Sequence, residues 1–395
     1  MVGRQQPKTP RFFIDMASYL HATGHGEYYV RDDDEHADTP TDHKIHYGDK
    51  SDLLYCNTAS LVKFKGRDVG GSNTSQKIIN YRATSGNGFP TMKIDCLVAL
   101  NHNFEDMSIS FSGTKYSGAG CMSYVSAHSL VNWGGPIYQN GFSIRKKNTP
   151  DIIDQDVEKI HLKYGSSSWV TGERYIGALF FGKTYTPPEN CNTIVSMSRI
   201  FDGIRQNTTR GGYIHNNVQY TGSQLWSEHN PWELWDYSTS PKYTQLVENY
   251  IGEAGTQPMF VKDNKRKTGN LGRKEWTINI KSIREDDIFP AYESTSMYPF
   301  EEDSAYPFSD LYDTQGGFTF EESGFKENPS LLEDNFISRV WHPTLGGSIP
   351  FLFQPDKDNN SLDQFSICII DRNSISLRPV APSIYDLNFT VKEVW

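Results

Sequence analysis

The stretch Leu387-Asn388-Phe389-Thr390-Val391-Lys392 decides the class of fold. Its apolar and polar side chains alternate with a period of two, which is typical of a β-strand with one buried face. Two apolar runs precede it, Ile349 to Phe353 and Phe365 to Ile370, and turn-forming residues at 356–360 separate those runs. We therefore predict that this part of the chain folds as paired strands and that the alternating stretch is built into a sheet.

Three short helices are expected elsewhere. One covers Arg11 to Leu20. A second covers Pro241 to Ile251, because Ser240 can cap it and proline suits the first helical position. The third follows Asn328-Pro329-Ser330, where apolar residues recur every four positions on one face, at Leu332, Phe336 and Val340. The polar residues 24–50 are expected to form a loop.

Five further stretches predict strands. Ile94 to Leu100 and Tyr175 to Phe181 are almost continuously apolar, as in strands that are buried on both faces. Three others alternate and should have one buried face. Their apolar positions are Met107, Ile109 and Phe111, then Ile160, Leu162 and Tyr164, and then Trp276, Ile278 and Ile280.

Length and composition favour a mainly β protein of two domains. The 395 residues exceed the roughly 250 to 300 at which a single core stops growing. Aromatic residues make up 13% of the chain although apolar residues make up only 36%, and turn-forming residues recur throughout. We predict two β-sandwich-like or barrel-like domains with a few short helices. The first spans residues 1–165 and the second 166–395, with the boundary near the seam at 165–168.

The cysteines and the hydropathy pattern bear on the cellular setting. The five cysteines have no CxxC spacing, which indicates reduced thiols and neither a disulfide framework nor a zinc site. No apolar run approaches the roughly 20 residues of a membrane span, and the first residues are polar. We therefore expect a soluble protein that is made in the cytosol.

An acidic insertion is predicted at residues 285–334. It holds fourteen acidic residues and one lysine, although the net charge of the whole chain is only −10. The insertion also contains four prolines and the triplet Tyr-Pro-Phe twice. One interpretation is a long solvated loop. The other is that its aromatic residues dock on a neighbouring basic surface while its carboxylates pair across that surface or bind calcium. No basic stripe interleaves with aromatic residues, so nucleic-acid binding is not expected.

Several motifs resemble ligand sites and have simpler explanations. Residues Gly177–Thr184 match the P-loop pattern, but the interior is Ala-Leu-Phe-Phe and two prolines prevent the helix that a P-loop requires. Asp356, Asp358 and Asn360 have the spacing that opens a calcium loop, but the glycine and distal glutamate are missing, so an ordinary turn is favoured. A group of histidines lies among acidic residues and is interpreted as a solvated loop and not as a metal site. These histidines are His21, His25, His36, His43 and His46.

Three tryptophans, Trp226, Trp232 and Trp235, lie within ten residues. Their indole rings could pack inside the fold, fill a subunit interface, or form a platform on which sugar rings stack. Signatures of catalysis are otherwise missing: the chain has no GxSxG elbow and no HxE motif with a downstream PCxxC. We therefore expect no enzymatic activity, no cofactor and no resident metal.

Several segments together resemble a group of structural proteins of tailed viruses that infect marine cyanobacteria and other pelagic bacteria. They are Leu100 to Phe104, Tyr175 to Gly182, Gly272 to Ile278, and Asp334 to Trp395, the last including Pro350 to Asp356 and Asp363 to Cys368. A looser similarity extends to minor tail and distal tail proteins, which have an Arg-x-Trp strand like Arg273 to Trp276. The long acidic insertion and the Asp/His-rich stretch near the start depart from simple tail-ring proteins.

This resemblance implies a virion component without catalytic residues. Distal tail proteins form rings around a tail tube and sometimes carry a galectin-like sandwich, so the first domain is expected to be of jelly-roll or galectin-like type. The implied partners are sister copies in a ring and other virion proteins, with no nucleic acid and no membrane span. Two alternatives stay open: a module that binds or degrades host-surface glycans through the three tryptophans, and a capsid decoration protein.

Overall fold

The computed structural model describes thirteen stretches of the chain, and all structural statements below concern these residues. They are 9–30, 45–58, 60–64, 77–84, 88–102, 106–113, 141–153, 156–165, 174–200, 204–218, 273–290, 331–359 and 364–394.

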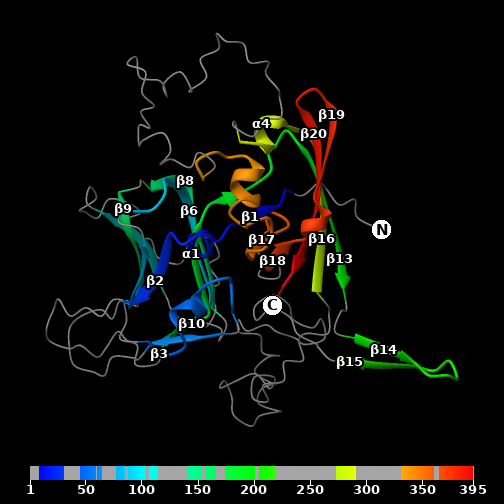
Figure 1. Ribbon diagram of the computed structural model, residues 1–395, viewed down its shortest axis with the longest axis horizontal. Coiled ribbons are helices and arrows are strands. Elements are labelled where there is room, and N and C mark those ends of the chain that lie inside the picture. The colour runs from blue at the N-terminus through cyan, green and yellow to red at the C-terminus, as the bar shows by residue number, and fades with distance from the viewer. Residues whose placement is uncertain are drawn as a thin grey trace, which may run out of the picture.

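The largest sheet has eight strands in the order β12-β1-β17-β18-β20-β16-β13, and β19 pairs additionally with β20 (Figure 1). Its strands are β1 (Arg11–Phe13), β12 (Thr184–Tyr185), β13 (Asn192–Ile200), β16 (Arg273–Arg284), β17 (Phe351–Gln354), β18 (Ser366–Ile370), β19 (Ser376–Ala381) and β20 (Ile384–Glu393).

The other strands form a four-stranded sheet (β2-β5-β9-β7), two three-stranded sheets (β11-β6-β8 and β10-β4-β3) and one hairpin (β14-β15). Their bounds are β2 (Gly26–Val30), β3 (Ile45–Tyr47), β4 (Val62–Phe64), β5 (Lys77–Ala83), β6 (Met92–His102), β7 (Asp106–Gly113), β8 (Gly141–Ile153), β9 (Val157–Gly165), β10 (Arg174–Ile176), β11 (Ala178–Gly182), β14 (Ile204–Thr208) and β15 (Ile214–Val218). The pairings between described strands are antiparallel throughout.

The helices of the described residues are short. They are α1 (Met16–Ala22), η1 (Lys50–Leu53), α4 (Glu285–Ile288), the π-helical turn η4 (Ile337–Trp341) and η6 (Arg372–Ser374). In the part of the chain that the structure describes, no helix is both long enough and apolar enough to cross a membrane. The protein is thus mainly β, as predicted.

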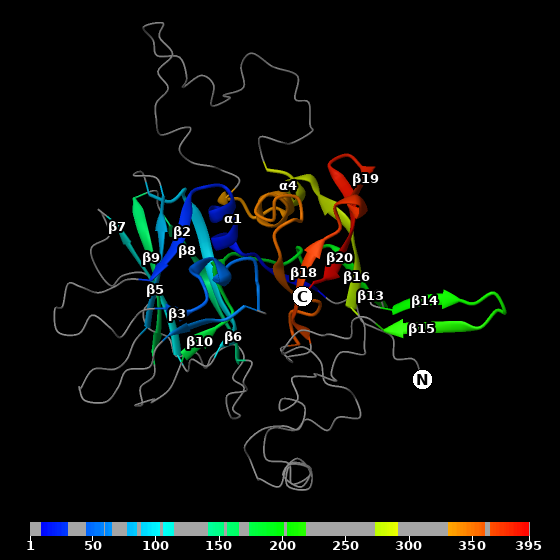
Figure 2. The ribbon, with the colours of Figure 1, turned by 60° about the horizontal axis from the view of Figure 1, so that its bottom comes forward.

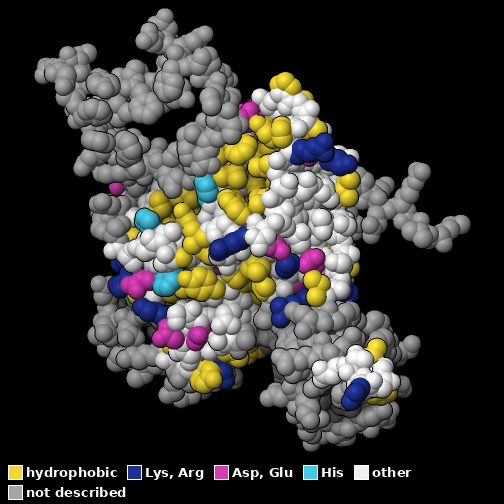
Figure 3. Space-filling model, turned by 45° about the vertical axis from the view of Figure 1, so that its right-hand side comes forward, with side chains coloured by type: hydrophobic (Ala, Val, Ile, Leu, Met, Phe, Trp, Pro, Cys, Tyr) yellow, Lys and Arg dark blue, Asp and Glu magenta, His cyan; other side chains and the backbone are white. Residues whose placement is uncertain are grey.

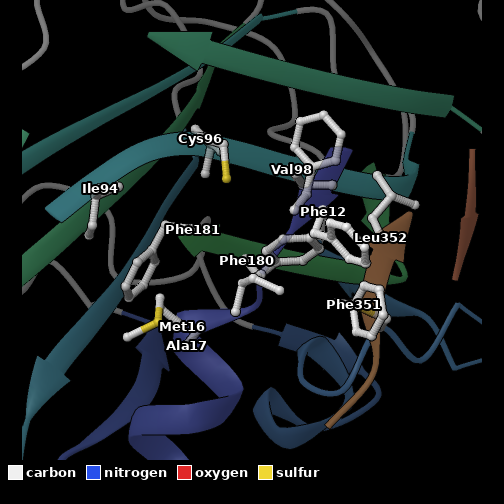
Figure 4. Close-up of a cluster of buried hydrophobic side chains, with 14 of the residues drawn as sticks. Phe12, Met16, Ala17, Ile94, Cys96, Val98, Phe180, Phe181, Phe351 and Leu352 are labelled. Carbon is white, nitrogen blue, oxygen red and sulfur yellow. The ribbon is translucent and has the colours of Figure 1, made fainter. Parts of the chain in front are cut away.

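The β11-β6-β8 sheet lies between the four-stranded and the eight-stranded sheets (Figures 1 and 2). On one side, the rings of Tyr81 in β5 and Phe181 in β11 have centroids 5.2 Å apart. On the other side, a Cβ placed on Gly182 would lie 1.8 Å from the carbonyl oxygen of Ile14. Both faces of β11 are therefore covered, which explains its continuous apolar sequence. Figure 4 shows side chains of α1, β1, β6, β11 and β17 in one buried cluster.

Seven of the eight predicted strands are confirmed. Residues 94–100 lie in β6, 107–111 in β7, 160–164 in β9, 276–280 in β16, 351–353 in β17, 366–370 in β18 and 387–392 in β20. In β20 the buried residues alternate with partly exposed ones, and the strand is paired on both sides, with β16 and with β18 and β19. The predicted turn is present at its described residues, where the amide of Asn359 donates to the carbonyl of Asp356.

The prediction of a helix over Arg11 to Leu20 is wrong in its first half. Residues Arg11–Phe13 form β1, between β12 and β17, and the helix begins only at Met16. The cause is Asp15, whose carboxylate accepts the amide of Ser18 and so caps the helix at that point.

The third helix also begins later than predicted. The Asn335 side chain accepts the amide of Ser338 at 2.8 Å, and the helical turn covers Ile337–Trp341. Phe336 and Val340 are buried as expected, whereas Leu332 lies before the turn and is half-buried. The helix predicted at 241–251 lies outside the described residues.

Two other predictions need correction. Residues 24–50 are not all loop, because Gly26–Val30 forms β2 and Ile45–Tyr47 forms β3. The run 175–181 is not one strand: Gly177 separates β10, which pairs with β4, from β11, which pairs with β6. Strand β11, which follows the boundary predicted near residue 165, completes a sheet with β6 and β8, and the division into two domains stays a prediction.

Candidate assembly surface

Strand β13 forms one edge of the eight-stranded sheet. Its nine residues pair with β16 from Asn192 opposite Lys281 to Ile200 opposite Arg273. Among the described strands it has no second neighbour. No described strand pairs with the backbone N–H and C=O groups on its outer side, which is the arrangement of a sheet edge.

Apolar side chains accompany this edge. Ile194 is 41% exposed, Met197 55% and Ile200 38%. Met197 lies opposite the buried Trp276 and therefore on the same face of the sheet, the face that packs on the core. Met197 itself is exposed, so this apolar face extends past the edge of the core. A long edge strand with exposed apolar side chains is the kind of edge that promotes pairing with another chain.

The hairpin β14-β15, here called the arm, projects from the body close to the end of β13 (Figures 1 and 2). Five cross-strand pairs join its strands, from Ile204 opposite Val218 to Thr208 opposite Ile214. The turn is held by the amide of Thr209, which donates to the carbonyl of Tyr213 at 2.8 Å, and by Gly212, whose φ of 81° suits glycine.

The end of the arm is exposed. Tyr213 is 70% and Ile214 53% exposed, and Arg210 lies beside them. In Figure 3 the arm, at the lower right, presents hydrophobic and basic side chains. An isolated two-stranded hairpin is marginally stable in water.

The acidic insertion begins at a well-fixed root. The amide of Glu285, the first residue of α4, donates to the carbonyl of Ser383 at 2.9 Å. Ile288 is fully buried, and the rings of Phe289 and Tyr385 meet edge to face at 6.0 Å. The chain is therefore held against β19 and β20 up to the point where the described residues stop at Pro290.

The insertion ends at a second fixed root, which is a charged clamp. The buried guanidinium of Arg339 donates to the carbonyls of Leu331 and Leu332 at 2.8 and 2.6 Å. It also donates to the carboxylate of Asp334 at 3.1 Å. Asp334 pairs further with Lys93 at 3.3 Å and with Lys183 at 3.7 Å.

Electrostatics accord with a structural role for this clamp. Burial lowers the pKa of Arg339, and Asp334 opposes that effect. Burial alone would raise the pKa of Asp334, but Arg339, Lys183 and Lys93 hold it below its usual value. Deeper in the protein, burial raises the pKa of Asp95, whose carboxylate accepts both the amide and the hydroxyl of Thr184 at 2.7 Å.

The motifs identified in the sequence do not assemble into a site. Strand β11 forms the interior of the P-loop match, Ala178–Gly182, and is fully buried. His21 and His25 are exposed, and His25 contacts Thr23. The Asp356 side chain accepts the amide of Asp358 at 3.2 Å, as in an ordinary turn. Within the described stretches, no group of histidine, cysteine and acidic side chains could hold a metal ion.

The remaining candidates are only partly described. The tryptophans Trp226, Trp232 and Trp235 lie outside the described residues, as do His36, His43 and Cys121. The other four cysteines, Cys56, Cys96, Cys191 and Cys368, are free thiols.

The sequence-based reasoning missed both the edge strand and the arm. A signal for the arm is present, because Gly211-Gly212 between two stretches of β-forming residues is a hairpin pattern. No such signal exists for the edge, since its position depends on the order of the strands in the sheet. The sequence matches no protein-family model, and the search of curated proteins found no match either.

Proposed function

We propose that this chain is a structural subunit of a tailed bacteriophage virion. Within the virion it belongs to a tail or baseplate ring, in which it assembles with copies of itself and with neighbouring tail proteins. The observation that carries the proposal is the combination of the open, apolar edge of β13 with the projecting arm. A surface of this kind suits a protein that completes its burial against other subunits.

The resemblance of Asp334 to Trp395 and of the Arg273 to Trp276 strand to virion proteins supports the same function. Both segments contribute strands to the eight-stranded sheet that ends at β13: the first contributes β17 to β20 and the second begins β16. The region of the resemblance is thus continuous with the proposed assembly surface.

The glycan-binding alternative depends on Trp226, Trp232 and Trp235. The capsid decoration alternative differs from the proposed function only in placing the protein on the head of the particle. Both stay predictions. Substitution of Trp232 by alanine tests the first: loss of sugar binding with folding and assembly intact would favour a glycan platform. Imaging of labelled particles, which separates head from tail, tests the second.

Self-association is tested by sedimentation velocity of the purified chain over a range of concentrations. We expect concentration-dependent oligomers that weaken in Met197→Lys, because a lysine on an edge strand opposes edge pairing. The control is Ile152→Lys, an exposed apolar residue on β8, which should associate like the wild type. The virion assignment itself is tested by mass spectrometry of purified particles. Absence of the chain at stoichiometric level would refute it.

A further inference from the structure

The arm and the acidic insertion lie at opposite ends of one long strand pair. Strand β16 runs for twelve residues, or about 40 Å at about 3.3 Å per residue. At one end Arg273 faces Ile200, and only residues 201–203 separate Ile200 from the arm. At the other end β16 leads directly into α4, the first root of the acidic insertion.

Both roots of the insertion lie at this second end. Figures 1 and 2 show α4 next to the segment that contains η4. Two observations agree with this placement. The ring of Tyr185 in β12 meets that of Phe336, next to η4, at 5.8 Å, and the charge of Asp287 in α4 adds to the effect of burial, the main cause of the raised pKa of Tyr185. The two described roots on either side of residues 291–330 therefore lie at the end away from the arm.

The two ends carry complementary charge. Residues 204–218 contain Arg205 and Arg210 and no acidic residue. Residues 291–330 contain nine acidic residues and one lysine. Several exposed cations on the body are already paired, such as Arg82 with Glu27 and Lys357 with Glu189. By contrast, Arg210 forms no ion pair with any described residue.

The arm and the insertion are also complementary in apolar character. Tyr213 and Ile214 offer an exposed apolar surface next to Arg210. The insertion contains Tyr-Pro-Phe at 298–300 and again at 306–308. Aromatic rings pack on apolar side chains and receive arginine guanidinium groups on their faces.

We propose that the arm of one copy binds the acidic insertion of a second copy. The contact is head to tail, because it joins one end of a molecule to the opposite end of the next. Repetition of such a contact generates a ring if the rotation closes and a filament if it does not. This inference rests on the proposed function and names the partner of the candidate assembly surface.

The first experiment compares three full-length proteins by sedimentation velocity: the wild type, Arg205→Glu/Arg210→Glu, and the control Arg372→Glu/Arg378→Glu. The control makes the same change in net charge on two exposed residues of the body. Reversal of charge in the arm should weaken association by about tenfold or more, because like charges then meet across the contact. The control should match the wild type. Salt should weaken wild-type association between 0.1 M and about 1 M, where the Debye length falls from about 10 to about 3 Å.

A mixing experiment separates contacts between copies from contacts within one copy. The acid-neutral variant replaces the nine acidic residues of 291–330 by their amides. It and the arm-reversed variant should each associate at least about tenfold more weakly alone than the wild type does, but should form a one-to-one pair together, since one supplies the arm and the other the insertion. Circular dichroism checks that both are folded.

The outcomes are distinguishable. Wild-type association that survives arm reversal, or a mixture that does not pair, would overturn the head-to-tail contact and leave self-assembly standing. A wild type that is monomeric at every concentration would overturn both this inference and the proposed self-assembly.

Discussion

Replacement of Asp15 by asparagine should change how the stability of the protein depends on pH. Asp15 is 1% exposed and caps helix α1, where its carboxylate accepts the amide and the hydroxyl of Ser18 at 2.8 and 2.5 Å. Burial raises its pKa to about 7 from an ordinary value of 3.8, although the bonds from Ser18 oppose the rise. The folded protein therefore holds this proton more tightly than the unfolded chain does.

The sign and size of the effect follow from that difference. The stabilisation from the bound proton is fully present below about pH 4 and is lost as pH rises to about 7. A shift of about three units corresponds to about 4 kcal/mol, at about 1.36 kcal/mol per unit. Asparagine caps helices about as well as aspartate but does not titrate. The free energy of unfolding of Asp15→Asn, relative to that of the wild type, should thus rise by up to about 4 kcal/mol as the pH increases from about 4 to about 8.

The assay is urea-induced unfolding of both proteins at several pH values across this interval. Other titrating groups are common to both proteins and cancel in the difference. Asp49→Asn is the control, because Asp49 caps η1 on the surface and the bonds from Ser51 lower its pKa. It should show no such gain. A difference between Asp15→Asn and the wild type that stays constant with pH would refute the reasoning.

Three further predictions concern packing, the clamp and the thiols. Gly182→Ala should lower the free energy of unfolding by about 3 kcal/mol or more, because the added Cβ would overlap the carbonyl of Ile14. Gly211→Ala has open space and should change it by no more than about 0.5 kcal/mol. Chemical unfolding measures both. Arg339→Ala should lower the free energy of unfolding by about 3 kcal/mol, because two carbonyls lose a charged donor. Asp334→Asn should lower it by about 1 kcal/mol or less, because the Asp334 side chain is 63% exposed. Equal losses would contradict this account. In a Cys121→Ser background, a thiol reagent should label Cys191 first, because Cys191 is partly exposed whereas the other three thiols are buried. Burial raises the pKa of Cys191 too, but it raises the pKa of Cys56, Cys96 and Cys368 well above the usual value. Equal rates at all four thiols would disprove this account.

The strands were predictable wherever burial leaves a regular pattern in the sequence. The alternation of Trp276, Ile278 and Ile280 and the continuous run of Ile94 to Leu100 each reflect how many faces of the strand are covered. Short elements were not predictable, because three residues such as Arg11–Phe13 contain no period. The clamp was not predictable either, since Arg339 and Lys93 are far apart in sequence and meet Asp334 only after folding.

The sequence by itself determined that the protein is mainly β, which faces of its long strands are buried, and where charge accumulates, because these properties depend on neighbouring residues. The tertiary structure alone decided that β1 lies between β12 and β17, that β13 is left at an edge, and that the arm and the roots of the acidic insertion are at opposite ends. Strand order joins residues hundreds of positions apart, and a local pattern of apolar side chains specifies a face but not a neighbour.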